Sequence, residues 1–428
     1  MTTTRRMLLS AACAIALSAS TLFGQAAAPA ASAVRILRDI MYLADDAREG
    51  RGMGTAGLDS AAAYIAREFQ QAGLQPGGTQ DYFQTFSIDA SAPVLAHCGI
   101  KPSPVKNVVG ILPGKGRLVG QVVVVGAHYD HLGLGECSAL DPDSAGKVHN
   151  GADDNASGTA SVMEIARAIR GRNQRVADAR TIVFITFAAE ELGALGSHYY
   201  VANPVRPNDS TYIMINLDMV GRPVDRRLSA LGAESAVELL AVLDTVNATH
   251  KLAVSGSGNG WGASDHAEFY ARRMPVIHFF TGIHTDYHKA TDDWQKIDAN
   301  GEAAVTAYIA DVTWKFATRP QPLTLVFAPP PAPIAGAGGD RPYLGTLPDM
   351  SSTPGGVRIS GTGPGSPAEK AGLKAGDILI RIGEREIKSL EDMQAALLGH
   401  KPGDVVEIAV RRGDSTVAVQ ATLSRRGG

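Results

Sequence analysis

Cysteine is the scarcest informative residue in this chain, and its scarcity excludes several kinds of chemistry. The 428-residue sequence has three cysteines, and no two are spaced Cys-x-x-Cys. Neither a thiolate metal site nor a dithiol redox motif is therefore expected. Cys13 lies in an N-terminal apolar stretch, which leaves Cys98 and Cys137 as the possible disulfide pair. The sequence alone does not decide whether they bond, because it does not give their separation in space.

An excess of charge of either sign is also lacking. The 40 Lys and Arg residues nearly balance the 43 Asp and Glu residues, the net charge is -3, and no basic stripe occurs, so we expect no nucleic-acid partner. Beyond the N-terminus no stretch is long and apolar enough to cross a membrane, so no membrane span is predicted. With 45% hydrophobic residues, the chain can bury a core and has the length for more than one domain.

The first residues have the pattern of an export signal. Arg5 and Arg6 precede an apolar run from Met7 to Ser20, and small residues follow at 24–28. The run is too short to span a bilayer. We therefore predict a signal peptide over residues 1–28 and export to the periplasm or the cell exterior, by the general or the twin-arginine route.

Strand and helix patterns alternate through the middle of the chain. Val122 to Val125 is a continuous β-branched run, typical of a strand buried on both faces, and similar runs occur at 181–187, 212–217 and 276–280. Segments with helical spacing separate these runs. The alternation predicts an α/β fold with a mostly parallel, mixed sheet covered on both sides, and active residues at the strand ends.

The composition changes after Thr318. A proline-rich stretch at 329–333 and a Gly/Ala stretch up to residue 339 predict a linker over residues 320–340. Short strand patterns and two short helices follow, so residues 341–426 are expected to form a small β-rich domain.

Side chains that can bind metal recur where predicted strands end or helices begin. They are His128 with Asp130, Asp153, Glu190 with Glu191, Asp218, and His288. If the chain stays extended, Asp130 lies on the same side as His128 and can accept the far N–H of that imidazole. Each place also has a simpler interpretation, such as Asp154 or Asn155 capping the helix that begins there. The coincidence of five such places favours a metal site.

The residue types indicate zinc. Two histidines with several carboxylates suit Zn²⁺ better than Ca²⁺, which prefers oxygen ligands alone. Asp153, Glu191 and Asp218 carry three negative charges, which together with a bridging hydroxide neutralise two Zn²⁺ ions. Glu190 is then available as a general base.

The same motifs resemble those of the co-catalytic di-zinc aminopeptidases of the bacterial leucyl aminopeptidase type, metallopeptidase family 28. The matching strings are His128-x-Asp130, Gly151-Ala-Asp-Asp-Asn-Ala-Ser-Gly158, Ala189-Glu-Glu-Leu-Gly193, Asn216-Leu-Asp-Met219 and Tyr287-His288. The resemblance runs from about Val34 to Thr318. It implies a three-layer zinc-exopeptidase fold over residues 32–319 and hydrolysis of N-terminal residues from peptides with free N-termini.

The resemblance also implies roles for individual residues. One zinc would be held by His128 and Asp218, the other by Glu191 and His288, and Asp153 would bridge them, with a cis peptide bond after Asp153. Glu190 would take a proton from water and return one to the leaving amine. Tyr287 is expected to stabilise the tetrahedral oxyanion.

The C-terminal residues resemble a PDZ domain of the bacterial protease type. The resemblance rests on Tyr343-Leu-Gly-Thr346 and on the segment from Gly365 to Leu379. It implies that a peptide adds as a strand, with its C-terminal carboxylate held at the loop of Leu344 and Gly345. A domain that only contacts the catalytic domain is the alternative.

Other activities remain open. A glutaminyl cyclase with one zinc or a carboxypeptidase can share the expected fold, and so can a catalytically dead PDZ adaptor. The five expected ligands favour two metals, and Glu190 argues against an inactive protein.

Overall fold

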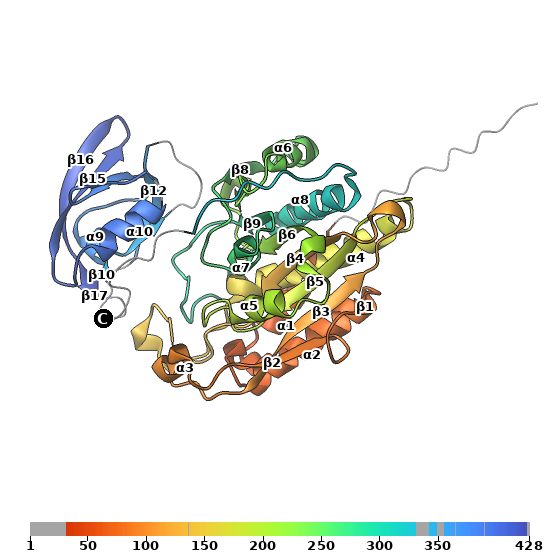
Figure 1. Cartoon of the computed structure of the whole chain (residues 1–428). Coiled ribbons are helices and arrows are strands. Elements are labelled where there is room, and N and C mark those ends of the chain that lie inside the picture. Colours follow the sequence, from red (N-terminus) through yellow and green to blue (C-terminus); the bar gives the residue numbers. More distant parts are fainter. Residues whose placement is uncertain are drawn as a thin grey trace, which may run out of the picture.

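The computed structural model describes residues 31–135, 137–330, 342–348, 355–363, 365–388 and 390–425. The predicted signal peptide over residues 1–28 and residues 331–340 of the predicted linker lie outside the described residues. Helices and a large sheet form the main body, and the C-terminal elements form a second group with its own sheet (Figure 1).

The large sheet contains nine described strands. They are β1 (Gln75–Pro76), β2 (Phe83–Ser87), β3 (Pro104–Leu112), β4 (Val122–His128), β5 (Thr181–Phe187), β6 (Thr211–Leu217), β7 (Arg227–Leu231), β8 (Ala253–Ser257) and β9 (Val276–Phe280). Their order is β1-β3-β5-β4-β6-β9-β7-β8, with β2 paired to β3. The central strands β5, β4, β6 and β9 are parallel, whereas β3 and β7 flank them in antiparallel pairs. The predicted mostly parallel, mixed sheet is confirmed.

Helices cover both faces of this sheet. They are α1 (Ala33–Leu43), α2 (Ala56–Gln71), α3 (Pro93–Cys98), α4 (Gly158–Asn173), α5 (Leu195–Ala202), α6 (Leu239–His250), α7 (His266–Ala271) and α8 (Ala299–Thr318). Short helical turns are η1 (Asp46–Arg51), η2 (Gly116–Leu118), η3 (Pro142–Ser144), η4 (Ala152–Ser157), η5 (Asn208–Ser210), η6 (Val224–Arg226) and η7 (Trp294–Lys296). None of the described helices combines the length and apolar character that crossing a bilayer requires.

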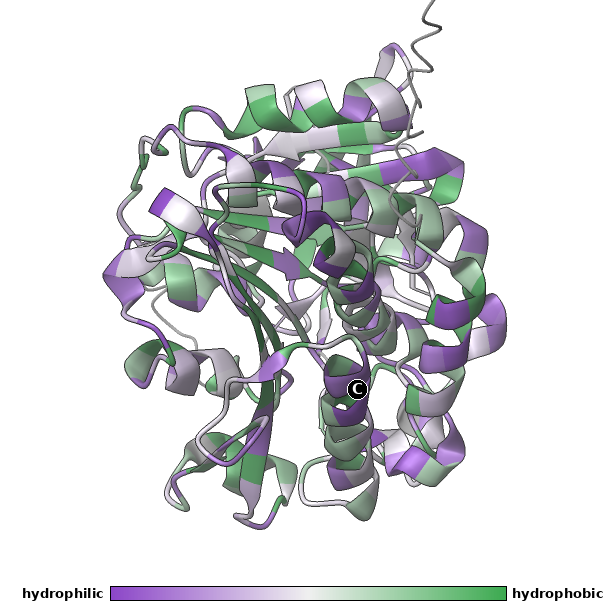
Figure 2. Ribbon diagram, turned by 90° about the vertical axis from the view of Figure 1, so that its right-hand side faces the viewer, coloured by the Kyte–Doolittle hydropathy of each residue, from purple (hydrophilic) through white to green (hydrophobic). Residues whose placement is uncertain are grey.

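The valine run of β4 is explained by the three layers of the fold. Val123 and Val125 belong to the core under α1, α2, α4, α6 and α8, whereas Val122 and Val124 belong to the core under α5 and α7. Successive side chains of a strand point to opposite faces, so a strand between two helical layers must be apolar at every position. Figure 2 shows the hydrophobic colouring that continues along the central strands.

A disulfide joins Cys98, the last residue of α3, to Cys137 in the loop after β4. The sequence left this bond open, and the helix α3 itself was not expected. Pro93 begins α3, and Gly99 ends it with φ 65°, a left-handed conformation that glycine adopts without strain.

The C-terminal group has a separate hydrophobic core. Its strands are β10 (Pro342–Tyr343), β11 (Thr346–Pro348), β12 (Val357–Thr362), β13 (Ile378–Ile382), β14 (Arg385–Glu386), β15 (Val405–Arg412), β16 (Ser415–Thr422) and β17 (Ser424–Arg425), and its helices are α9 (Pro367–Lys370) and α10 (Leu390–Leu398). The main sheet has the order β11-β12-β13-β15-β16 and is antiparallel throughout. The short strands and two short helices predicted for this part of the chain are present.

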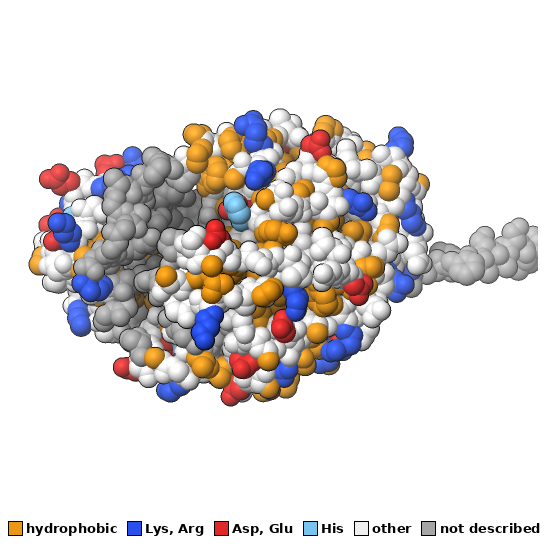
Figure 3. All heavy atoms as spheres, turned by 60° about the horizontal axis from the view of Figure 1, so that its bottom comes forward, with side chains coloured by type: hydrophobic (Ala, Val, Ile, Leu, Met, Phe, Trp, Pro, Cys, Tyr) orange, Lys and Arg blue, Asp and Glu red, His pale blue; other side chains and the backbone are white. Residues whose placement is uncertain are grey.

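The surface carries charges of both signs. On the face shown in Figure 3, acidic and basic side chains are interspersed among hydrophobic ones. No one sign dominates that face, in agreement with the balanced composition.

Candidate metal centre

Parallel strands bring most of the predicted ligands to one edge of the sheet. His128 is the last residue of β4, Asp218 follows β6 directly, and Glu190 and Glu191 lie three and four residues after β5. These three strands are neighbours, so their carboxyl ends meet. His288 reaches the same place from the loop after β9.

One group of ligand atoms surrounds His128. Its Nε2 lies 3.3 Å from Asp154 Oδ1, 3.5 Å from Asp218 Oδ1 and 3.9 Å from Glu190 Oε2. All four side chains are buried or nearly so. Ligand atoms in a tetrahedral zinc site lie roughly 3.3 Å from one another, because each bond is about 2.0–2.1 Å long. The spacing around His128 fits such a site.

A second group surrounds His288. Its Nε2 lies 3.3 Å from Asp154 Oδ2 and 3.3 Å from Glu191 Oε2. The carboxylate of Asp154 thus directs one oxygen toward His128 and the other toward His288. An aspartate in that position can be shared by two metal ions.

The predicted bridging residue, Asp153, is wrong by one position. Its Oδ1 accepts a hydrogen bond from the Gly221 N–H at 2.8 Å, and its Oδ2 lies 3.1 Å from His284 Nε2, so the carboxylate faces away from His128. The side chains of Asp153 and Asp154 leave η4 in different directions, and only Asp154 reaches both histidines. The cis peptide bond joins Asp154 to Asn155, again one residue later than expected.

Backbone contacts hold this turn. Asp292 Oδ2 accepts hydrogen bonds from the N–H groups of both Asp153 and Asp154, each at 3.0 Å. The amide oxygen of Asn155 accepts from Gly158 N–H at the start of α4, so the capping role considered for this residue exists beside the metal site. Sequence reasoning missed Asp292, because it is more than 130 residues away from the turn that it supports.

The two histidines are oriented as metal ligands. The Nδ1 of His128 lies 3.2 Å from the backbone oxygen of Asp130, and the Nδ1 of His288 lies 2.9 Å from that of Ser138. A carbonyl oxygen only accepts, so in both rings Nδ1 carries the proton. The Nε2 atoms therefore face the carboxylates, where they can bind a cation as neutral ligands or, without one, carry a proton.

Asp130 supports the site differently from the prediction. Its carboxylate lies 3.8 Å from His128 Nδ1, too far for a hydrogen bond, and the backbone oxygen takes that place. The carboxylate accepts instead from the backbone N–H groups of Glu190 at 3.1 Å and Glu191 at 3.3 Å. Asp130 thus links the ends of β4 and β5.

Two further residues support the site. His131, which the sequence analysis did not select, lies with Nδ1 2.8 Å from Glu191 Oε1. Arg51 is fully buried and donates to the backbone oxygens of Tyr129 and Gly151, which joins the segments that carry His128 and Asp154. Burial lowers the pKa of Arg51 to about 10, so its side chain remains charged at neutral pH.

The electrostatics of the centre favour cation binding. Burial alone would lower the pKa of His128, but the charges of Asp218 and Glu190 raise it well above its ordinary value. Burial likewise opposes ionisation of Glu191, yet His288 and the hydrogen bond with His131 lower its pKa to about 2. Four carboxylates thus face two histidines, and divalent cations would balance the excess negative charge. The residues therefore fit zinc.

Tyr287 lies beside this centre. Its ring stacks on that of His288 with the ring centroids 3.9 Å apart, and its side chain is half-buried. Burial raises the pKa of its hydroxyl, which therefore stays protonated at neutral pH. The predicted role in oxyanion binding remains a prediction.

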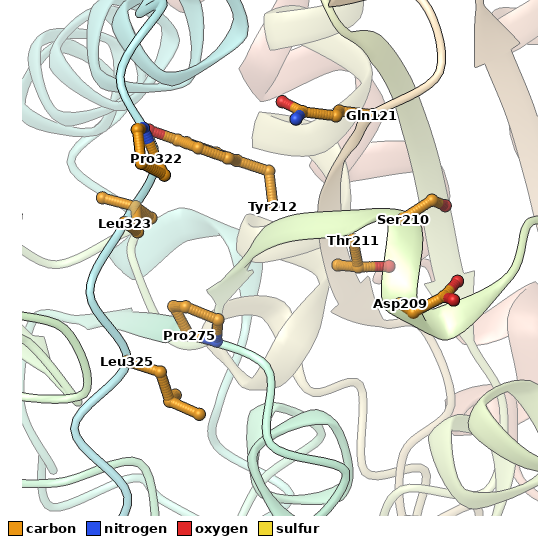
Figure 4. Close-up of a pocket in the computed structure, with 9 residues that line it drawn as sticks. All are labelled: Gln121, Asp209, Ser210, Thr211, Tyr212, Pro275, Pro322, Leu323 and Leu325. Carbon is orange, nitrogen blue, oxygen red and sulfur yellow. The ribbon is translucent and has the colours of Figure 1, made fainter.

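A cavity elsewhere lacks such chemistry. It has a volume of about 180 Å³ and lies where β6 begins, at the opposite end of that strand from Asp218 (Figure 4). Its lining includes one carboxylate, Asp209, and no histidine. Among the residues that the structure describes, the side-chain groups that could hold a metal ion lie at the opposite ends of the strands, around His128.

Comparison with solved structures places the fold among zinc exopeptidases. A Zn-dependent exopeptidase from Parabacteroides distasonis superposes with a TM-score of 0.55 at 20% identity, over 67% of this chain and 99% of the other. A glutaminyl cyclase from Porphyromonas gingivalis gives the same TM-score and identity, over 66% and 98%. These likenesses establish the fold alone.

Sequence comparison identifies two domains. Residues 107–313 match Peptidase family M28, and residues 342–423 match the PDZ domain. The chain therefore carries a Peptidase family M28 domain followed by a PDZ domain.

Individual relatives agree with both assignments. A probable leucine aminopeptidase of Arthroderma otae is 29% identical over 218 residues, which are 49% of this chain and 56% of that protein. Aminopeptidase YwaD of Bacillus subtilis is 37% identical over 117 residues, 27% of this chain and 22% of its own length. The serine protease Do-like HtrA of Lactococcus lactis is 36% identical over 75 residues, 18% of each chain. The chain thus spans at most about half the length of these relatives.

Proposed function

We propose that this protein is an exported zinc aminopeptidase that removes N-terminal residues from peptides by a two-metal mechanism. The observation that carries the proposal is the position of Asp154, whose two carboxylate oxygens lie 3.3 Å from His128 Nε2 and from His288 Nε2. Family membership and the aminopeptidase relatives support the reaction class. The Cys98–Cys137 disulfide supports export, because disulfides persist in oxidising compartments.

The proposal assigns two metal sites. His128 and Asp218 would hold one zinc, Glu191 and His288 the other, and Asp154 would be shared by both. When bound, such a pair lowers the pKa of a shared water and polarises the scissile carbonyl.

The protein's own groups then have distinct tasks. Glu190 lies within 3.9 Å of His128 Nε2 and would take the proton of the attacking water and give one to the leaving amine. Tyr287, stacked on His288, would donate a hydrogen bond to the tetrahedral oxyanion. The excess of carboxylates would attract the free ammonium group of the substrate.

The decisive experiment uses a mixture of peptides with free or acetylated N-termini. The purified protein is expected to shorten only the free peptides, one residue at a time, and a chelator should abolish the reaction. Metal analysis should give two zinc ions per chain. Cleavage of acetylated peptides or loss of C-terminal residues would overturn the aminopeptidase assignment.

A glutaminyl cyclase is the second candidate, because the solved glutaminyl cyclase has the same TM-score as the exopeptidase. It would release ammonia from an N-terminal glutamine without shortening the chain. A single zinc together with that product would favour the cyclase. A folded, zinc-loaded protein with neither product would instead be a PDZ adaptor on an inactive peptidase fold.

The PDZ domain would bind a C-terminal peptide. Strand β11 lies at one end of its sheet among the described residues, so a peptide can add there. Gly345, at φ 82°, lies so close to Ser366 that an added Cβ would meet its Cβ at 2.2 Å, and the loop therefore requires glycine. Peptides with a free C-terminus should bind, whereas amidated ones should not. Equal binding would count against carboxylate capture at Leu344 and Gly345.

A further inference from the structure

A second, larger cavity opens directly beside the candidate metal centre. Its volume is about 390 Å³, and Glu191 and His131 are part of its lining. Glu191 is also one of the proposed zinc ligands, so the cavity and the centre share a wall. The volume is near the lower end of the ~300–1,000 Å³ that ligand pockets usually have, which suits a part of a short peptide.

The cavity is formed by four loops. They follow η1, α3, β4 and β5. The disulfide Cys98–Cys137 joins the second loop to the third, and an added Cβ on Gly52 would lie 2.7 Å from the Gly133 Cα, so the first and third loops also touch. The walls are therefore held together on several sides before any ligand binds, and a preformed pocket costs less ordering on binding.

The lining is mostly apolar and includes one lysine. Its apolar side chains are Met53, Ile100, Leu132, Leu134 and Leu192. Two charged side chains also line it outside the metal centre, Lys101 and Glu49. Glu49 Oε2 accepts a hydrogen bond from the Gly57 N–H at 2.7 Å, so this carboxylate binds the first turn of α2. Lys101 is exposed and makes no ion pair with the described residues. Lys101 is thus the one cationic side chain among Lys and Arg in this lining, and it is available to a carboxylate of a ligand.

We propose that this cavity binds the part of the substrate that follows the scissile bond. An apolar side chain would enter the cavity, and the C-terminal carboxylate of a short peptide would pair with Lys101. A peptide bound in the reverse orientation, with its N-terminus in the cavity, is disfavoured. Its ammonium group would then lie near Lys101 instead of the acidic metal centre. The inference rests on the proposed aminopeptidase activity and names its substrate class: di- and tripeptides with an apolar residue after the first.

The proposed pairing of Lys101 with the substrate's carboxylate is tested with two substrates, Leu-Leu and Leu-Leu-amide. The wild type should cleave the free acid with the higher kcat/KM, by roughly two- to fivefold, as expected for one exposed ion pair. Lys101→Gln should abolish the preference, and Lys101→Glu should reverse it. Lys251→Gln, which changes an exposed lysine just after α6, is the matched control and should leave the preference unchanged.

The apolar lining is tested with Leu-Leu and Leu-Gly. Leu134 is 39% exposed, so Leu134→Ser should not unfold the protein. This variant should reduce kcat/KM for Leu-Leu by roughly three- to tenfold and leave Leu-Gly nearly unaffected, because only the first peptide places a side chain in the cavity. Zinc content, measured in parallel, should not change.

The outcomes separate the two proposals. If the zinc-loaded wild type cleaves none of these peptides, the proposed function fails and the cavity assignment fails with it. If the wild type cleaves them but the Lys101 and Leu134 variants keep its preferences, the aminopeptidase stands and the cavity assignment alone is overturned.

Discussion

Asp292 accepts a hydrogen bond from the backbone N–H of Asp154 at 3.0 Å, and this contact holds the proposed bridging carboxylate in place. The same oxygen, Oδ2, accepts from Asp153 N–H. Asp292 is fully buried, and its carboxylate contacts the turn through these two backbone N–H groups. It is therefore a positioning residue.

Replacing Asp292 should consequently weaken metal binding. We expect Asp292→Ala to lower zinc affinity by about 10–100-fold, as is usual when a group that orients a metal ligand is removed. Asp292→Asn keeps an acceptor oxygen and is the matched control, with a smaller loss. Competition with a chromogenic chelator measures both affinities, and equal affinity in Asp292→Ala and wild type would contradict this role.

Two substitutions separate the functions of the neighbouring acids Asp153 and Asp154. Asp154→Asn should lose zinc, because the shared carboxylate is removed. Asp153→Asn should keep zinc, because that side chain faces Gly221 and His284. Elemental analysis after dialysis checks both variants. The reverse result would restore Asp153 as the bridging residue.

Glu190→Gln tests the proposed general base. The variant should retain zinc, because Glu190 is the more distant of the carboxylates around His128. Its kcat should fall by about 10²–10⁴-fold, the usual contribution of general acid–base catalysis. Steady-state kinetics on one peptide, together with zinc content, measures the effect. An active variant would exclude Glu190 as the base.

These acids also show how far the sequence determines the site. Strand ends are readable from apolar runs, so His128, Glu191 and Asp218 could be assigned to one edge of the sheet. Asp153 and Asp154 are adjacent in an irregular turn, where no periodicity tells which side chain faces the metal. His131 and Asp292 support the site through long-range contacts, which a single sequence does not encode in any local pattern.

The disulfide gives a stability prediction. It closes a loop over a sequence separation of 39 residues, for which the chain-entropy model gives up to about 4 kcal/mol. The double substitution Cys98→Ala and Cys137→Ala should lower the free energy of unfolding by up to that amount. Denaturation with and without a reductant measures it. The reductant should affect the wild type and leave the variant unchanged, whereas equal sensitivity would argue against the bond.

The PDZ domain contains an ion pair that should make its stability depend on pH. Arg412 Nε and Nη2 each lie 2.7 Å from an oxygen of the buried Asp377 carboxylate. Burial tends to raise the pKa of Asp377, but the hydrogen bonds from Arg412 and Lys374 N–H hold it below its ordinary value. The folded state therefore binds the proton more weakly than the unfolded state.

The lowered pKa of Asp377 determines how the stability of the PDZ domain changes with pH. The stabilisation is present above the unfolded-state pKa near 4 and is lost as the pH falls through the lower folded-state value. Hydrogen exchange of the β13 amides in the full chain should accelerate in acid, after correction for the intrinsic pH dependence. Asp377→Asn should be destabilised at neutral pH by about 1–3 kcal/mol and respond less to acid. If the variant keeps the wild-type acid response, other groups cause it, and the Asp377–Arg412 pair contributes little to the fold.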